Sequence, residues 1–150
     1  QIDSRGDIYV SSRGDYYNTP SNLFVIDTKT DEKKMQLDIP VSGTCLVDDL
    51  LYYYSVSWSY LTGSNKVSYG ILDTKTKKIV TDKIITDGTD KKIMIPYGLQ
   101  VNPETKEIYI TDAQNYVVTG YIYCFTPDGK LKWKTTAGNI PAHIAFITKK

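Results

Sequence analysis

The feature that most constrains this chain is an internal repeat with a period of about 45 to 57 residues. An Ile-Pro pair occurs at 39–40, 95–96 and 140–141. The run Phe-Val-Ile-Asp-Thr-Lys-Thr at 24–30 returns as Gly-Ile-Leu-Asp-Thr-Lys-Thr at 70–76. A recurrence of this length indicates copies of one structural unit that pack against each other.

Each copy reads as four short strands joined by turns. In the middle copy we expect strands at about 43–47, 50–56, 66–73 and 78–85. Asp, Thr, Pro and Gly in the connecting turns supply the side-chain caps and backbone angles that tight turns need. Four-stranded units at this period are typical of the blades of a β-propeller. A β-sandwich is the alternative fold.

Composition favours the same all-β class. The 150 residues include 13 Tyr, 2 Trp and 3 Phe, and aromatic residues favour pleated, half-buried surfaces. A net charge of +1 argues against a nucleic-acid binder that works through phosphate contacts. We expect Cys45 and Cys124 to be two buried free thiols. Neither a signal peptide nor an apolar run of membrane-spanning length is recognisable, which does not exclude secretion.

The repeat divides the chain into blades at 1–39, 40–95 and 96–139, followed by a closing strand at 140–150. The first blade has only a stub of its first strand, at 1–3. About three blades are fewer than the roughly four to eight that close a ring. We therefore expect the C-terminal part of a larger propeller, completed by missing blades or by a second copy of the chain.

A family resemblance rests on these same motifs. The Ile-Pro starts, the Glu-Ile-Tyr-Ile run at 107–110 and the Val-Ile-Asp-Thr-Lys-Thr run at 25–30 resemble YncE-type propellers of the YVTN and NHL class. More closely, they resemble the surface propellers of gut Bacteroidetes that carry the domain of unknown function 5074. The resemblance implies a secreted, surface-lipoprotein or periplasmic protein that acts by binding. One similar group binds vitamin B12 for a TonB-dependent transporter, but the sequence shows no residue-level motif for a corrinoid.

Strand alternation places the long connections at about 11–21, 55–65 and 111–120 on one face. Long loops on a rigid scaffold often carry function. Aromatic rings mixed with amides and hydroxyls suit a small organic ligand, a glycan or a corrinoid, although the rings could instead pack the loops together. The predicted ligand-binding residues are Tyr16, Tyr17, Trp58, Tyr60, Tyr97, Tyr116 and His143.

His143 is the only histidine, and it replaces the glycine found at the equivalent positions Gly43 and Gly98. That position begins the first strand of a unit, so His143 is expected near the mouth of the central channel. It could contact a ligand there, or make an ordinary hydrogen bond.

Catalytic motifs are not apparent, so we expect a noncatalytic protein without a cofactor or metal. No nucleophile motif, metal-ligand spacing or glycine-rich phosphate loop appears. Asp15 and Asp112 are the loop-face carboxylates, and Asp87 to Asp90 reads as a solvated turn rather than a cation site. Two alternatives stay open: a protein–protein scaffold that docks onto an outer-membrane transporter, and a lyase or hydrolase that uses His143 with residues outside this chain.

Overall fold

The computed structural model describes residues 1–15, 19, 21–59 and 61–147. These residues form three antiparallel sheets in chain order and one short 3-10 helix, η1 (Thr89–Lys92). The expected all-β class is therefore confirmed. Sheet 1 contains β1 (Asp7–Ser12), β2 (Asn22–Asp27) and β3 (Glu32–Leu37). Sheet 2 contains β4 (Gly43–Val47), β5 (Leu50–Ser59), β6 (Ser64–Asp73) and β7 (Lys78–Thr81). Sheet 3 contains β8 (Pro96–Val101), β9 (Ile108–Asp112), β10 (Gly120–Phe125) and β11 (Leu131–Ala137).

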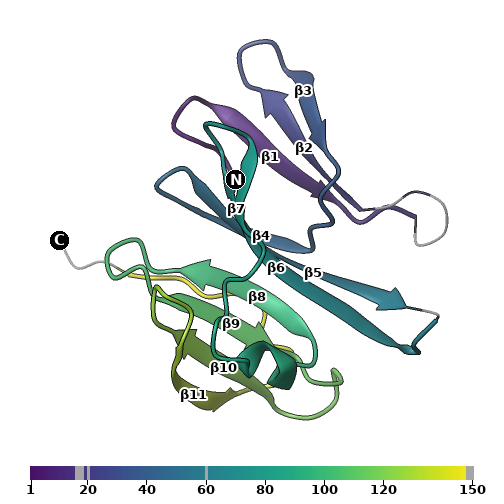
Figure 1. Cartoon of the computed structure of the whole chain (residues 1–150), viewed down its shortest axis with the longest axis vertical. Helices are drawn as coiled ribbons and strands as arrows, with labels where there is room; N and C mark the ends of the chain where they lie inside the picture. The colour runs from purple at the N-terminus through teal and green to yellow at the C-terminus, as the bar shows by residue number, and fades with distance from the viewer. Residues whose placement is uncertain (16–18, 20, 60, 148–150) are drawn as a thin grey trace.

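Within each sheet, every strand pairs with the strand that follows it in the chain. The three sheets lie one after another, and the described residues do not close into a ring (Figure 1). The structure therefore establishes three successive meanders, while the propeller stays a prediction.

The middle sheet shows how well the alternation predicts strands. The first predicted strand, 43–47, matches β4 in full. The next two are longer than predicted, because the β5–β6 ladder continues to the pair Ser59 and Ser64. The predicted loop at 55–65 is thus wrong over most of its length. Ser55, Val56 and Ser57 pair with residues of β6, so backbone hydrogen bonding extends the hairpin through this segment.

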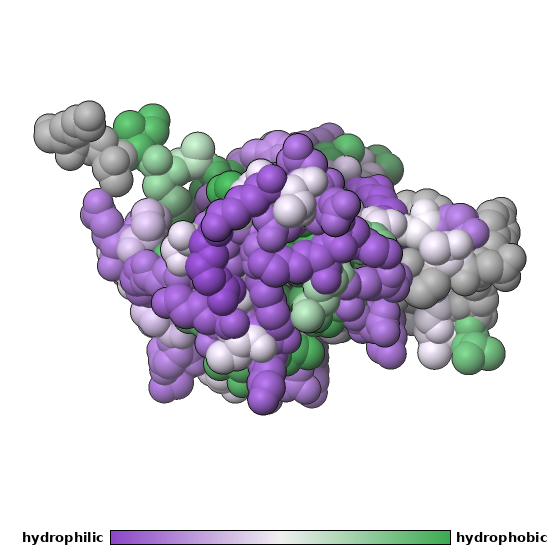
Figure 2. Space-filling view, turned by 90° about the horizontal axis from the view of Figure 1, so that it is seen from above, coloured by the Kyte–Doolittle hydropathy of each residue, from purple (hydrophilic) through white to green (hydrophobic). Residues whose placement is uncertain are grey.

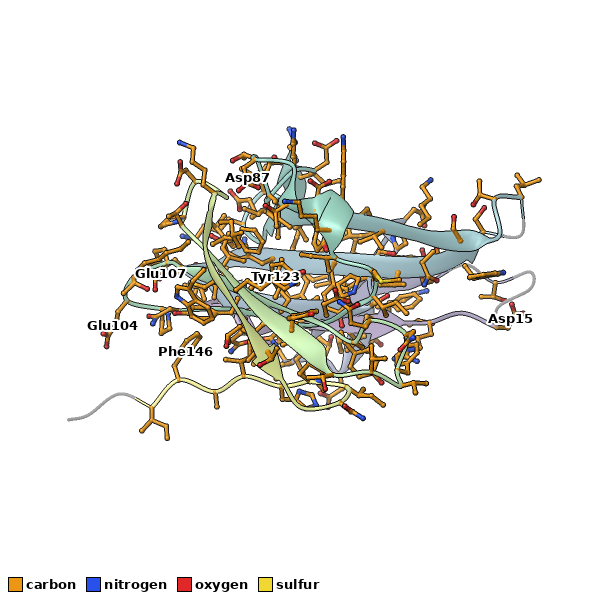
Figure 3. The ribbon with its side chains drawn as sticks, turned by 90° about the horizontal axis from the view of Figure 1, so that it is seen from below. Asp15, Asp87, Glu104, Glu107, Tyr123 and Phe146 are labelled. Atoms are coloured by element: carbon orange, nitrogen blue, oxygen red, sulfur yellow. The ribbon has the colours of Figure 1, made fainter. Side chains whose placement is uncertain are left out.

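Within the predicted closing strand, residues 141–147 belong to no strand of the described residues, and its pairing with a further blade stays a prediction. This C-terminal segment crosses the outer face of sheet 3, with the Phe146 ring 5.1 Å from the Tyr109 ring (Figure 3). The backbone oxygen of Ala142 lies where a side chain on Gly98 would stand, so this approach requires a glycine. A segment on the face of a sheet cannot join its ladder, because ladder hydrogen bonds run in the plane of the sheet.

Two apolar cores hold the sheets together. The first lies between sheets 1 and 2 and includes Tyr9, Leu23, Val25, Leu51 and Leu72. The second lies between sheets 2 and 3 and includes Cys45, Tyr54, Tyr69, Ile110, Tyr123 and Phe125. The prediction of buried free thiols is confirmed for both cysteines. Burial raises the pKa of the Cys45 thiol, whose sulfur accepts a hydrogen bond from the Val101 N–H at 3.3 Å.

A buried polar network joins sheets 1 and 2 at their turn end. Lys77, from the β6–β7 turn, lies 2.9 Å from an Asp7 carboxylate oxygen and 3.7 Å from an Asp3 oxygen. It also bonds the Tyr9 hydroxyl and lies over the Tyr9 ring. Arg5 adds a bond to the backbone oxygen of Thr74. Residues about 70 positions apart are thereby tied together by charge as well as by apolar contact.

The surface seen from the β2–β3 side is mainly hydrophilic, with apolar side chains scattered over it (Figure 2). Within the described part of the chain, no helix has the length and hydropathy needed to cross a bilayer.

Candidate functional site

A cavity of about 1180 Å³ lies between sheets 2 and 3 and is called the main cavity below. One wall comes from β4 and β5, and the opposite wall comes from β8. The β1–β2 loop and the C-terminal segment complete its rim, through Arg13 and His143. Residues that are far apart in the sequence thus enclose a single space.

Four of the predicted binding residues line this cavity: Trp58, Tyr97, Tyr116 and His143. They come from β5, β8, the β9–β10 loop and the C-terminal segment. The other three, Tyr16, Tyr17 and Tyr60, lie outside the described residues. The structure therefore brings together every predicted binding residue that it describes.

Tyr97 and Tyr116 form an edge-to-face pair, with ring centroids 5.7 Å apart and an interplanar angle of 81°. Such a pair gains from the attraction between the positive edge of one ring and the negative face of the other. The pair fixes the β9–β10 loop against β8. Tyr116 is still 46% exposed, so its ring presents surface to the cavity as well as to Tyr97.

Trp58 stands near the end of the long β5–β6 hairpin, opposite Asn65, and is 55% exposed. Both residues line the cavity. The β5–β6 hairpin and the β1–β2 loop project toward the same side of the molecule (Figure 1). Asp15 in that loop lies at the end opposite Glu104 and Glu107 of the β8–β9 turn (Figure 3). Long connections and short turns therefore occupy opposite ends, and the cavity opens among the long ones.

His143 reaches the cavity by a route that differs from the prediction. It was expected to begin a strand, but it lies on the extended C-terminal segment beside β8. The close approach of Ala142 to Gly98 holds this part of the segment in place. His143 is exposed and lines the cavity.

Sequence reasoning missed Tyr54, which forms part of the cavity wall and is 6% exposed. Its ring packs against Gly43, where a Cβ atom would collide with it. Burial raises the pKa of Tyr54 to about 12, and the positive charge of Arg13 opposes that rise. The hydroxyl therefore stays protonated at neutral pH. The signal was the unbroken Tyr-Tyr-Tyr run at 52–54, whose successive residues face opposite sides of sheet 2.

The carboxylates considered for chemistry have structural partners. Asp112 is fully buried, and its oxygens accept hydrogen bonds from the backbone N–H groups of Met94, Ile95 and Gln114 and from the Gln114 amide. Asp15 accepts the N–H and the hydroxyl of Thr19. Both carboxylates thus order the connections in which they occur.

Asp87 also has a structural role, because it accepts the N–H of Thr89 at 2.9 Å and the N–H of Leu131 at 2.8 Å. It thereby ties the segment before η1 to β11. Over residues 1–15, 19, 21–59 and 61–147, no three His, Cys, Asp or Glu side chains gather where they could hold a metal.

A smaller cavity of about 390 Å³ lies between β6 and the segment around η1. Tyr69 lines it, although the Tyr69 hydroxyl is buried and has no hydrogen-bond partner. Burial raises the pKa of Tyr69, and the charges of Asp112 and Asp90 add to that rise. The volume of this smaller cavity is about a third of that of the main cavity, and none of the four predicted binding residues that the structure describes lines it.

The main cavity combines aromatic surface, hydroxyl and amide groups, and one guanidinium. Such a lining can hold a ligand by ring contact and hydrogen bonding without breaking a bond in it. No protein-family model matches the chain, and no curated protein matches it.

Proposed function

We propose that this chain is a noncatalytic ligand-binding module, and that the 1180 Å³ cavity holds a small organic ligand or a glycan. One observation carries the proposal: residues selected from the sequence as binding candidates line one cavity from four separate segments. The four residues lie on four different segments of the chain, so no single strand or loop brings them together. Packing within one loop would not bring them to a common space.

The chemistry of the lining supports binding. Trp58, Tyr97 and Tyr116 offer flat apolar area at a low cost in side-chain entropy. Ser57, Asn65 and Gln100 add hydroxyl and amide groups that can orient a polar ligand. Ligand pockets in proteins commonly have this mixture of apolar area and a few polar groups.

The absence of catalysis is part of the proposal and rests on how the carboxylates are used. A general acid or base must exchange a proton with a substrate. The four hydrogen bonds to Asp112 and the burial of its side chain keep that carboxylate away from solvent. Asp15 uses both oxygens to hold Thr19.

We further propose that the three meanders are blades of a larger β-propeller at the bacterial cell surface or in the periplasm, as the resemblance implies. The outer face of sheet 1 supports an additional neighbour. Ile8, Val10, Phe24 and Ile26 alternate with the buried residues of β1 and β2, and Val10 is 45% exposed. Further blades, or a second copy of the chain, would cover this apolar face. A corrinoid is one candidate ligand for such a protein.

A protein partner is the second candidate function, because apolar side chains protrude at the cavity end. Leu61 is 99% exposed and Val117 is 74% exposed. Both lie in connections next to the cavity-lining residues Trp58 and Tyr116. A transporter domain in the outer membrane could bind this apolar rim, and the substitutions Leu61→Asp and Val117→Asp would then abolish the complex.

Tryptophan fluorescence tests the proposal, because the chain has two tryptophans and only Trp58 lines the cavity. The variant Trp133→Phe leaves Trp58 as the sole reporter, and Trp58→Phe leaves the matched control reporter on β11. We expect saturable quenching in Trp133→Phe with cyanocobalamin or with a member of an oligosaccharide panel. Identical curves in both variants, or no change with any compound, would contradict a small-molecule site in this cavity.

A further inference from the structure

The described residues that line the main cavity include basic side chains and no acidic ones. The chain contains 17 Asp and Glu residues, yet the described residues that line the cavity include none of them. The lining does include the guanidinium of Arg13 and the imidazole of His143. An anionic group that enters the cavity therefore meets a fixed positive charge and no carboxylate within the wall.

Arg13 is exposed at the rim of the cavity, so its guanidinium is accessible to a ligand that enters. The guanidinium charge opposes the rise in pKa that burial causes in Tyr54, a residue of the cavity wall. The cavity wall also contains buried apolar residues, since Val41 is 1% exposed and Leu99 is 7% exposed. Charge interactions strengthen where water is displaced by apolar surface. The exposed guanidinium at the rim is therefore placed to meet the carboxylate of a ligand that enters the cavity.

The size and remaining lining indicate what carries that carboxylate. A volume of about 1180 Å³ exceeds the roughly 300 to 1,000 Å³ of pockets for drug-sized molecules. The Tyr97–Tyr116 pair and Trp58 stand on different elements along the cavity and can each pack against the face of a sugar ring. Asn65 and Gln100 can bond the hydroxyls of such rings.

We propose that the cavity selects an acidic oligosaccharide, one built from uronic-acid units, and that Arg13 binds a uronate carboxylate. This inference rests on the proposed ligand-binding function and specifies its ligand class. Arginine suits the role because its planar guanidinium can bond both oxygens of a carboxylate. A neutral glycan of the same size would keep the ring contacts and lose the charge-assisted hydrogen bonds.

The test compares trigalacturonate with its methyl ester, which has the same rings and no charge. In the Trp133→Phe background, Trp58 fluorescence should show the acid binding about tenfold more tightly than the ester, as expected for one charge-assisted hydrogen bond of about 1.4 kcal/mol. Arg13→Gln should weaken binding of the acid about tenfold and leave binding of the ester unchanged. Lys78→Gln removes the same charge from β7, outside the cavity, and should change neither.

The possible results separate the two proposals. Equal affinity for the acid and the ester, or equal weakening of both by Arg13→Gln, would overturn the acidic-ligand inference while the binding function stands. No binding of the acid, together with binding of a neutral oligosaccharide or cyanocobalamin from the panel, would overturn it in the same way. No binding of any compound would overturn the acidic-ligand inference and the small-molecule function together.

Discussion

Replacing Lys77 with Met tests whether the buried charge network holds sheets 1 and 2 together. Lys77 provides the ammonium that lies 2.9 Å from Asp7 and 3.7 Å from Asp3. Asp3 is 6% exposed and Asp7 is 4% exposed, so both carboxylates are largely desolvated. Methionine keeps the aliphatic contact with the Tyr9 ring and removes only the charge. Lys77 has a φ of 59°, and Met has the same Cβ constraint there, so backbone strain is unchanged.

The expected loss follows from what remains around the carboxylates. Removing one partner of a buried ion pair costs about 3–5 kcal/mol, because it leaves an uncompensated buried charge. Lys34 still lies 3.0 Å from Asp7, and Arg5 still lies 3.2 Å from Asp3. These residual partners place the expected loss at the lower end, about 3 kcal/mol.

Urea unfolding followed by circular dichroism measures this loss as a lower midpoint at constant slope. Lys130→Met is the matched control, because Lys130 pairs with Asp128 on an exposed turn and should contribute nothing measurable. The double variant Lys77→Met with Asp7→Asn should recover part of the loss, since one of the unpaired charges is then gone. A Lys77→Met midpoint within error of the wild type would refute the reasoning.

Three further predictions concern the Asp7 carboxylate, the C-terminal segment and the two thiols. The hydrogen bond from Lys77, with a further bond from Lys34, lowers the pKa of Asp7. The Asp7 carboxylate therefore stabilises the fold above about pH 4, and this stabilisation is lost as the pH falls through the lowered pKa. The urea midpoint of the wild type should therefore fall between pH 4 and pH 2 more steeply than that of Asp7→Asn, and equal slopes would contradict this. Gly98→Ala should displace the C-terminal segment and speed proteolysis near Ala142. Gly138→Ala is the control and should not, because Gly138 has open space around it. Equal cleavage rates in the two variants would contradict the docking of the C-terminal segment on sheet 3. Both thiols are buried, and burial raises the pKa of each. Ellman's reagent should therefore react rapidly with the two thiols only after denaturation. Fast labelling of the folded protein would contradict this burial.

The sequence predicted those residues of the candidate site that stand out by their type. It predicted less well the residues that reach the cavity through contacts between distant segments. Aromatic residues in long connections identified Trp58 and Tyr116, because exposed rings on loops are unusual enough to be informative. Tyr54 was missed, since one Tyr in a run of three cannot be assigned to the cavity wall without the neighbouring sheet. The structural role of Asp112 could not be predicted, and its position on a loop made it a candidate for chemistry. Its hydrogen bonds to Met94 and Ile95 join two segments whose proximity the sequence does not show.

Local patterns in the sequence predict the all-β class, the positions of most strands and the chemistry of the turns. These features are local: alternation has a period of two residues, and turns depend on a few Asp, Gly and Pro side chains. The contacts between distant segments became known only from the packing of the three sheets. This packing placed Lys77 beside Asp3 and Asp7, laid the C-terminal segment across sheet 3, and brought Arg13, Tyr97 and His143 around one cavity. Such contacts depend on how whole sheets pack, and no local pattern specifies which faces meet.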